Sequence, residues 1–260
     1  MSTKKRIKLV VQYDGYDFCG WAPQAGQRTV HGTLTEGIRL ISSEEIEVTG
    51  ASRTDSGAHA RGQVCHFDAE QAIPPERWAY ALNRALPPDM KIVSSQEVPA
   101  DFHSRFWAKK RFYRYRILNG EIDPFRSRYT FRERKPLDLE SMQIAAQDFI
   151  GTHNFLAFSQ EIKPGQNLER TLYSVDVKAS RDEIWVDVVG TAFVRGMMRR
   201  ISGCLWEIGR GLRPTSDVQR LLQMTDRRKI DWPTVLPACG LTLMKITYGR
   251  HPFDNRFTNE

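Results

Sequence analysis

The sequence predicts an α+β protein made of two ferredoxin-like halves, each with its elements in the order β-α-β-β-α-β. Two observations support this fold class. Strand and helix periods alternate in that order through the first hundred residues, and the same order returns in the rest of the chain. No low-complexity linker separates the halves, which we place at residues 1–105 and 106–260. We therefore expect an antiparallel sheet flanked by helices, with a tight interface and a basic cleft between the halves.

The elements of the first half follow from hydrophobic periods and from prolines. Alternate residues are apolar near the N-terminus, which is the period of a strand with one buried face. Thr29 precedes apolar residues at helical spacing and suits an N-cap. Paired prolines bracket a second helix, because proline is tolerated where a helix begins but cannot continue it. We expect strands at residues 6–13, 46–48, 64–67 and 92–98, and helices at residues 30–41 and 74–86.

The second half repeats these signals without obvious sequence identity to the first. Asp138 suits the N-cap of a helix, and Gly151 suits its C-terminal cap. The segment Ser180-Arg181-Asp182 separates two apolar runs and predicts a hairpin. We expect strands at residues 111–118, 172–177, 184–189 and 241–248, and helices at residues 138–150, 193–208 and 217–224.

Composition favours a cytoplasmic protein without a membrane segment. Hydrophobic residues make up 40% of the 260 residues, and no apolar run approaches the roughly 20 residues of a membrane helix. The basic N-terminus leads into a strand and not into a signal-peptide core. Four cysteines lie far apart without zinc-ligand spacing, so we expect reduced thiols, partly in the core, and no metal site. They are Cys19, Cys65, Cys204 and Cys239.

The positive charge points to a polyanionic partner. The chain has 38 Lys and Arg against 31 Asp and Glu, a formal charge of +7. A mild excess is weak support alone, but the cations are clustered, as in nucleic-acid-binding proteins. The clusters are Lys109 to Arg111, Arg126 to Arg134, Arg195 to Arg200, and Arg227 to Lys229.

A polar loop between two expected strands, residues 50–63, is richest in reactive side chains. Arg53 and Asp55 are two positions apart, so an extended loop directs both side chains the same way. A nearby arginine favours an ionised carboxylate, which suits an aspartate acting as nucleophile or base at a sugar carbon. The segment Asp55-Ser56-Gly57 also suits a plain turn in which the aspartate binds backbone amides.

Two further segments combine aromatic and cationic residues. Lys109 to Arg111 lead into a strand in which Tyr113 and Tyr115 share one face. In the expected helix over residues 193–208, Arg199 lies four residues after Arg195 and so on the same side. Such patterns suit base stacking and phosphate contact, although buried tyrosines and a solvated basic face would look the same.

The polar loop resembles the catalytic loop of tRNA pseudouridine synthases of the TruA family, whose pattern runs Gly-Arg-Thr-Asp-Ala-Gly-Val-His-Ala and then Gln. Ser52, Ser56 and Ala58 stand where the family usually has Gly, Ala and Val. Weaker similarities follow in the right order from Tyr13 to Tyr248. The matching loop residues are Arg53, Thr54, Asp55, Gly57, His59, Ala60 and Gln63.

The resemblance implies catalytic roles for three residues. Asp55 is the catalytic aspartate, Tyr113 stacks on the target base and helps to move its C5 proton, and Arg199 pairs with the aspartate. The helix departs from the family at Arg195-Gly196, where an aromatic residue and a histidine are common. The residues that we expect to bind the substrate are Arg53, His59, Arg61, Gln63, Lys109, Lys110 and Arg111.

The resemblance also implies two halves about a pseudo-twofold axis, an active site between them and a homodimer. The implied reaction converts uridine to pseudouridine at positions 38, 39 and 40 of the anticodon stem-loop of tRNA. The N1–C1′ bond breaks and a C5–C1′ bond forms with nothing gained or lost, so no cofactor is expected. Asp55 either attacks C1′ or removes a proton from C2′, and the sequence favours neither route.

Other functions fit parts of the sequence. A non-catalytic RNA-binding protein with two RRM-like units would need an aromatic RNP-type strand, and none here fits well. A pseudouridine synthase paralogue acting on another RNA would keep the same loop. A glycosidase would need a second carboxylic acid, and nothing marks Asp68 or Glu70 for that role. A metalloenzyme would need closely spaced metal ligands, which this sequence lacks. Our prediction is therefore a tRNA pseudouridine synthase.

Overall fold

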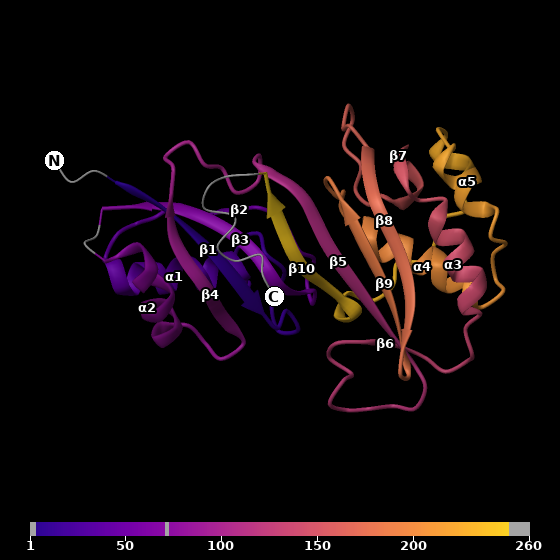
Figure 1. The fold of residues 1–260 in the computed structure, drawn as a ribbon, viewed down its shortest axis with the longest axis horizontal. Helices are drawn as coiled ribbons and strands as arrows, with labels where there is room; N and C mark the ends of the chain where they lie inside the picture. The colour runs from indigo at the N-terminus through magenta and orange to yellow at the C-terminus, as the bar shows by residue number, and fades with distance from the viewer. Residues whose placement is uncertain (1–3, 71–72, 250–260) are drawn as a thin grey trace. The chain divides into compact units, whose positions relative to one another are not determined.

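The computed structural model describes residues 4–70 and 73–249, and it confirms an α+β fold of antiparallel strands flanked by helices (Figure 1). The chain forms two compact units. Of the described residues, those up to Lys109 and those from Leu243 to Gly249 form the first unit, and Lys110–Thr242 form the second. The last strand therefore lies mostly in the first unit, whereas the sequence assigns it to the second half.

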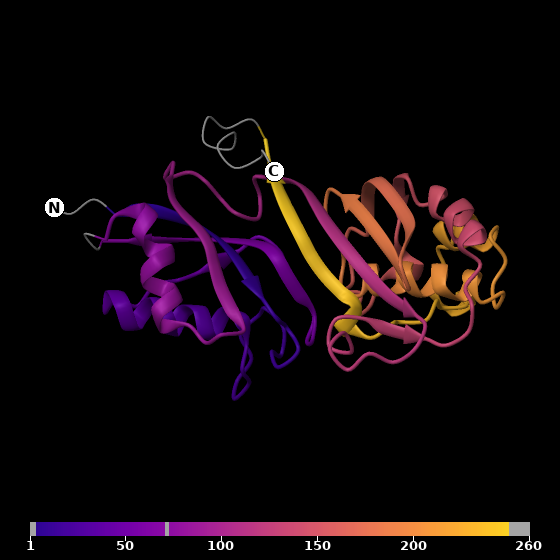
Figure 2. The ribbon, with the colours of Figure 1, turned by 60° about the horizontal axis from the view of Figure 1, so that its bottom comes forward.

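The first unit follows the expected order of elements. Strand β1 is hydrogen bonded between β4 and β3 and is antiparallel to both, while the short β2 pairs with β3. Helices α1 and α2 pack on each other and cover one face of this sheet (Figures 1 and 2). The elements are β1 (Lys5–Tyr13), α1 (Val30–Ser42), β2 (Thr49–Gly50), β3 (His59–Ala69), the 3-10 helix η1 (Pro75–Arg77), α2 (Trp78–Ala85), β4 (Met90–Val98) and β10 (Leu241–Tyr248).

The periods that predict this unit correspond to real burial. The alternating apolar side chains of β1 are at most 4% exposed, which confirms the strand with one buried face. Thr29 accepts a hydrogen bond from the Gly32 N–H at 3.1 Å, which confirms it as the N-cap of α1. The strand expected at residues 46–48 is shifted, because only Thr49 and Gly50 pair with β3.

The second unit has its strands in the order β5-β9-β8-β7, each antiparallel to its neighbour, and β6 pairs parallel with the end of β5. Helix α3 packs on β8 and on α4. The short strands β6 and β7 were not expected, since three or four residues give no period. The elements are β5 (Ala108–Asn119), β6 (Phe131–Glu133), α3 (Leu139–Gln147), β7 (Gly151–Asn154), η2 (Leu156–Phe158), β8 (Glu169–Ser180), β9 (Glu183–Gly190), α4 (Met197–Gly209), α5 (Asp217–Leu222), η3 (Arg227–Lys229) and η4 (Ala238–Gly240).

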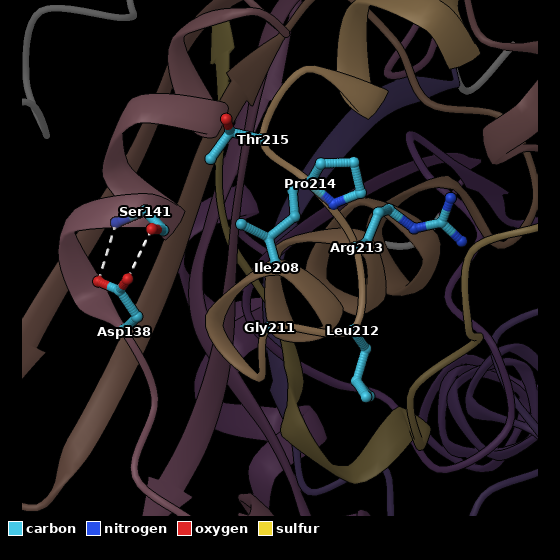
Figure 3. Close-up of a pocket in the computed structure, with 8 residues that line it drawn as sticks. All are labelled: Asp138, Ser141, Ile208, Gly211, Leu212, Arg213, Pro214 and Thr215. Carbon is cyan, nitrogen blue, oxygen red and sulfur yellow. Dashed lines mark hydrogen bonds between the residues drawn. The ribbon is translucent and has the colours of Figure 1, made fainter.

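The two ends of α3 and the turn between β8 and β9 test three of the sequence predictions for this unit. The Asp138 carboxylate accepts hydrogen bonds from the Ser141 N–H at 3.1 Å and the Ser141 hydroxyl at 2.6 Å, which confirms the N-cap of α3 (Figure 3). The predicted cap at Gly151 is wrong, because α3 ends at Gln147 and Gly151 begins β7. The predicted hairpin is confirmed, since β8 and β9 pair on either side of Arg181 and Asp182.

Helix α4 begins later than the sequence predicts. Its first residue is Met197, and Gly196 has a φ of +73°, a left-handed conformation that favours glycine and stops a helix. Arg195 therefore precedes the helix, and the prediction that Arg195 and Arg199 share a helical face is wrong. The two arginines are positioned by different pieces of backbone.

Two further expectations concern the chain as a whole. The four cysteines are free, and Cys65 and Cys204 are buried, as expected of partly core thiols. In the described part of the chain, no helix combines the length and the apolar character that crossing a membrane requires.

Candidate active site

The loop between β2 and β3 carries the candidate aspartate, and its backbone forms a tight turn. The Ala58 N–H donates to the Asp55 carbonyl at 3.1 Å, and Gly57 has a φ of +80° that other residues rarely adopt. The Gly57 N–H donates to the Phe18 carbonyl at 3.1 Å. The turn expected from the sequence is therefore confirmed in the backbone. Asp55 itself is half-buried, and its neighbours Arg53 and Ser56 are exposed.

Thr54 anchors the residue immediately before Asp55. Its side chain is 8% exposed, and its hydroxyl shares a hydrogen bond of 2.8 Å with the buried hydroxyl of Tyr13 at the end of β1. The Thr54 carbonyl accepts a hydrogen bond from the Trp21 N–H at 3.1 Å. The hydroxyl and the carbonyl of Thr54 are thus satisfied inside the protein, which helps to fix the position of the adjacent aspartate.

Gln63 holds the other end of the loop. Its side chain is fully buried, and its amide nitrogen donates to the Ser52 carbonyl at 2.6 Å. Its amide oxygen accepts from the Ser52 N–H at 3.3 Å and from the Val64 N–H at 3.1 Å. Gln63 therefore binds the backbone of the loop at both polar groups of Ser52. This placement favours a positioning role over direct contact with RNA.

His59 is also a support of the loop in this structure. Its ring is 4% exposed, and Nδ1 accepts a hydrogen bond from the Gly15 N–H at 2.9 Å. The Asp14 carboxylate lies 3.1 Å from the same nitrogen. His59 thus joins the start of β3 to the turn after β1. Arg61, two residues further on, is exposed and remains our predicted RNA contact.

A buried polar cluster lies along β3 beyond the loop. His66 is 6% exposed, its Nδ1 lies 3.0 Å from the Ser104 hydroxyl, and its ring contacts those of Phe102 and His103. Burial, with the nearby charge of Arg6, lowers the pKa of His66 to about 4. The ring is therefore neutral at pH 7, and its environment opposes protonation.

Strand β5 carries the predicted tyrosine and the cations before it. Tyr113 is 4% exposed and lies edge-on to Phe193, with 4.8 Å between ring centroids. Arg111 is buried and donates to the Thr191 carbonyl. The ammonium of the exposed Lys110 lies 4.7 Å from the centroid of the Tyr173 ring. Lys109 is exposed and belongs to the first unit, whereas Lys110 begins the second.

Arg199 lies in the first turn of α4, half-buried, and its Nε donates to the Leu236 carbonyl at 2.6 Å. The Leu236 N–H donates to the Arg199 carbonyl at 3.4 Å, so the segment after α5 holds both the side chain and the backbone. Arg199 also lines a cavity of about 690 Å³ within the second unit. A fixed arginine of this kind can orient a carboxylate or bind a phosphate.

The predicted residues therefore fall into two sets. Arg53, Asp55, His59, Arg61, Gln63 and Lys109 belong to the first unit, and Lys110, Arg111, Tyr113 and Arg199 belong to the second. Sequence reasoning missed Tyr13 as a support of the loop, although an aromatic residue ends the buried face of β1. It also left unconnected the cluster Arg227 to Lys229, two residues of which line the same cavity as Arg199.

Comparison with known proteins decides the family. The profile of the tRNA pseudouridine synthase family matches residues 9–107 and 145–249, which contain the Asp55 loop, Arg199 and the last strand. The chain belongs to the tRNA pseudouridine synthase family. This membership confirms the resemblance read from the Arg53-Thr54-Asp55 segment.

Curated relatives of this synthase match nearly its whole length. A tRNA pseudouridine synthase A of Brevibacillus brevis is 40% identical, and the alignment covers 94% of this chain and 100% of the relative. One of Halalkalibacterium halodurans is 42% identical over 86% of each chain. A chain in a crystal structure of a Cbf5-Nop10-Gar1 complex aligns with 76% of this synthase and 54% of its own length, at 10% identity and a TM-score of 0.32, which is too low to carry an argument.

Proposed function

We propose that this protein isomerises uridine to pseudouridine in the anticodon stem-loop of tRNA. One observation carries the proposal: the Arg-Thr-Asp core of the family loop is intact in a chain that belongs to the family along most of its length. The loop is also held in place before any substrate binds, by Tyr13 on one side and Gln63 on the other. A reacting carboxylate gains rate from such prior positioning.

The proposed reaction is balanced without a cofactor. The N1–C1′ glycosidic bond of uridine breaks, the uracil ring turns over, and C5 forms a new bond to C1′. The proton on C5 is lost and N1 gains one, so the product is an isomer. Asp55 acts at the ribose, either by adding to C1′ or by removing a proton from C2′.

Two residues of the second unit are proposed to act with Asp55. Tyr113 stacks on the target base and assists removal of the C5 proton, and its ring is already fixed against Phe193. Arg199 pairs with the aspartate, and its guanidinium is already oriented by the Leu236 carbonyl. The resemblance of the surrounding segments to the family motifs supports both assignments.

The RNA must present a single base, so a stacked uridine is flipped out of its helix at a cost of a few kcal/mol. We propose that Arg53, Arg61, Lys109 and Lys110 offset this cost through phosphate contacts. Arg111 is buried and holds the Thr191 carbonyl, so its role is support of the strand. His59 and Gln63 serve this binding by holding the loop, as their burial indicates. A homodimer and a cytoplasmic location are part of the same proposal.

The test is tritium release from tRNA labelled with [5-³H]uridine. We expect the wild-type protein to release tritium with EDTA present and no cofactor added. We expect the Asp55→Asn variant to release none. The product is then digested to nucleosides to show pseudouridine. Bound tRNA without tritium release would contradict the isomerase, and release of free uracil would indicate a glycosidase instead.

A further inference from the structure

Arginines from two distant segments meet in one cavity of the second unit. The cavity has a volume of about 690 Å³ and lies at the start of α4. Two arginines come from the first turns of that helix, one directly precedes its N-cap, and two come from η3, nearly thirty residues later. Its lining residues are Ser159, Gln160, Glu161, Arg195, Arg199, Arg200, Arg227, Arg228 and Trp232. We call this cavity the arginine pocket.

The arginine pocket has five guanidinium groups and a single carboxylate. That carboxylate, on Glu161, forms an ion pair with Arg195 at the exposed rim. In the described part of the chain, neither Arg227 nor Arg228 takes part in a salt bridge. Five guanidinium groups with one carboxylate among them repel one another, so a bound anion would stabilise the pocket.

Other arginines of the chain show that this lack of acids is local. A second cavity, of about 470 Å³, is lined by Arg213 and mostly uncharged residues (Figure 3). The Arg213 guanidinium donates to Glu207 at 2.7 Å and also to Asp217, so its charge is neutralised. Arg126, from another sequence cluster, pairs in the same way with Asp123 and Asp182.

The guanidinium groups of Arg200 and Arg227 are held in place by neutral partners. Arg200 lies over the Trp232 ring at 4.7 Å and donates to the Pro233 carbonyl at 2.7 Å, while Arg227 lies over the same ring at 5.8 Å. The Arg200 Nε is buried without a hydrogen-bond partner among the described residues. Stacking and carbonyl contacts orient these side chains without pairing either of them with a carboxylate.

The backbone contributes a further positive end. Gly196 is the N-cap of α4 and has no side chain with which to cap the helix, whose first N–H groups carry a partial positive charge. The Gln160 N–H donates to the Arg195 carbonyl at 2.8 Å, which holds the wall formed by residues 159–161 against the helix start. Helix N-termini beside arginines are suited to phosphate oxygens.

We propose that the arginine pocket binds a backbone phosphate of the tRNA strand that carries the target uridine. The proposal rests on the function proposed above and names the part of the substrate that the second unit holds. Arg199 connects the two ideas, since it lines the pocket and is the residue assigned to pair with Asp55. The phosphate therefore belongs to the target nucleotide or to one close to it in the strand.

The test removes the charge on each side of the proposed contact. The protein variant is Arg227→Gln with Arg228→Gln, which keeps side chains of similar length at exposed positions. The matched control is Arg77→Gln with Arg84→Gln, two exposed arginines around α2 that remove the same charge elsewhere. Thermal melting of each variant checks that it is folded.

The RNA side uses full-length tRNAs, each with one neutral methylphosphonate in the anticodon arm. The ribose before the altered linkage carries a 2′-O-methyl group in both the neutral RNA and its charged control. Binding is measured as Kd at several salt concentrations. We expect the pocket variant to raise Kd at least about tenfold and to lower the salt slope by about 1 to 2, whereas the control variant changes neither by as much.

The decisive quantity is the coupling between the two changes. One or two neutral linkages should weaken binding to the wild type and the control variant, yet have little further effect on the pocket variant. Equal losses in all three proteins at every linkage would overturn the proposal. Inorganic phosphate at matched ionic strength should compete with tRNA only weakly, and full displacement at low concentration would indicate a site for a free anion instead.

This outcome is separable from the proposed function. Coupling is read from binding, and isomerisation is read from tritium release by the wild type. Coupling without tritium release would retain the arginine pocket and contradict the isomerase. Tritium release without coupling would retain the isomerase and contradict the pocket.

Discussion

The Asp55 loop and the arginine pocket are built in opposite ways. The loop is supported by neutral hydrogen bonds that are complete within the protein, from Tyr13 to Thr54 and from Gln63 to Ser52. The pocket gathers cations, of which Arg227 and Arg228 form no salt bridge in the described part of the chain. The protein thus fixes the position of its reacting carboxylate in one region and gathers positive charge in another. A group that reacts is fixed in advance, while groups that bind a polyanion are left to be neutralised by it.

The largest effect should follow from changing the reacting group. Asp55→Asn keeps the shape of the side chain and removes its ability to act as nucleophile or base, so kcat should fall at least about 10³-fold. Because the loop is supported by other residues, the Kd for tRNA should stay within about twofold. Steady-state tritium release and filter binding measure the two quantities. A large rise in Kd with little change in kcat would make Asp55 a binding residue.

A smaller but substantial effect is expected at Arg199. This residue lines the arginine pocket, and we propose that it also pairs with Asp55. Arg199→Lys keeps the charge but loses the planar guanidinium that binds the Leu236 carbonyl and that we propose to bind a carboxylate as well. We expect kcat to fall about 10²-fold with a several-fold rise in KM. A change in KM alone would assign Arg199 to the pocket and not to Asp55.

Gln63 tests whether the loop needs its neutral support. Gln63→Leu leaves the buried Val64 N–H and the half-buried N–H and carbonyl of Ser52 without their side-chain partner, which should cost about 2 to 4 kcal/mol of unfolding free energy. We expect kcat to fall about tenfold with KM nearly unchanged, because the aspartate is less well positioned. Urea unfolding and tritium release are the measurements. An unchanged kcat in a destabilised variant would show that the clamp supports the fold only.

The smallest effect on activity concerns His66, which lies outside both regions. Its pKa is about 4 in the folded protein and about 6.5 when unfolded, so the neutral ring stabilises the fold above pH 6.5. This contribution is lost as the pH falls from about 6.5 toward 4, and about 2 kcal/mol of it should be gone at pH 5.

The variant His66→Asn isolates this contribution, since asparagine does not titrate. Its unfolding free energy should fall by about 2 kcal/mol less than that of the wild type between pH 7.5 and pH 5. Its kcat at pH 7.5 should be close to that of the wild type. Equal pH dependence in the two proteins would show that His66 is protonated without cost.

Segments with a regular hydrophobic period could be predicted from sequence. A residue with a positive φ and strands of three or four residues could not. The alternation in β1 and the N-caps Thr29 and Asp138 are enough to predict one strand and the starts of two helices. Burial and capping in these elements depend on residues that are close in sequence. The start of α4 was missed, since an apolar period continues through Gly196 while its positive φ breaks the helix. The short strands β6 and β7 depend on partners distant in sequence.

The candidate site divides in the same way. The Arg53-Thr54-Asp55 core could be found because its residues are adjacent and chemically distinctive. The supports Tyr13 and Gln63 act through contacts that join β1, β3 and the loop, and no local pattern shows them. The arginine pocket joins two clusters that were visible separately, but only the fold brings them to one cavity.

The most direct test of the account is single-turnover tritium release with enzyme in large excess over labelled tRNA. When the enzyme concentration is also well above the Kd of each variant, all tRNA is bound, so the rate reports the steps after binding. The account predicts that Arg227→Gln with Arg228→Gln recovers a rate near that of the wild type, while Asp55→Asn stays at least about 10³-fold slower. Rapid release by Asp55→Asn would contradict the assignment of Asp55 as the reacting group.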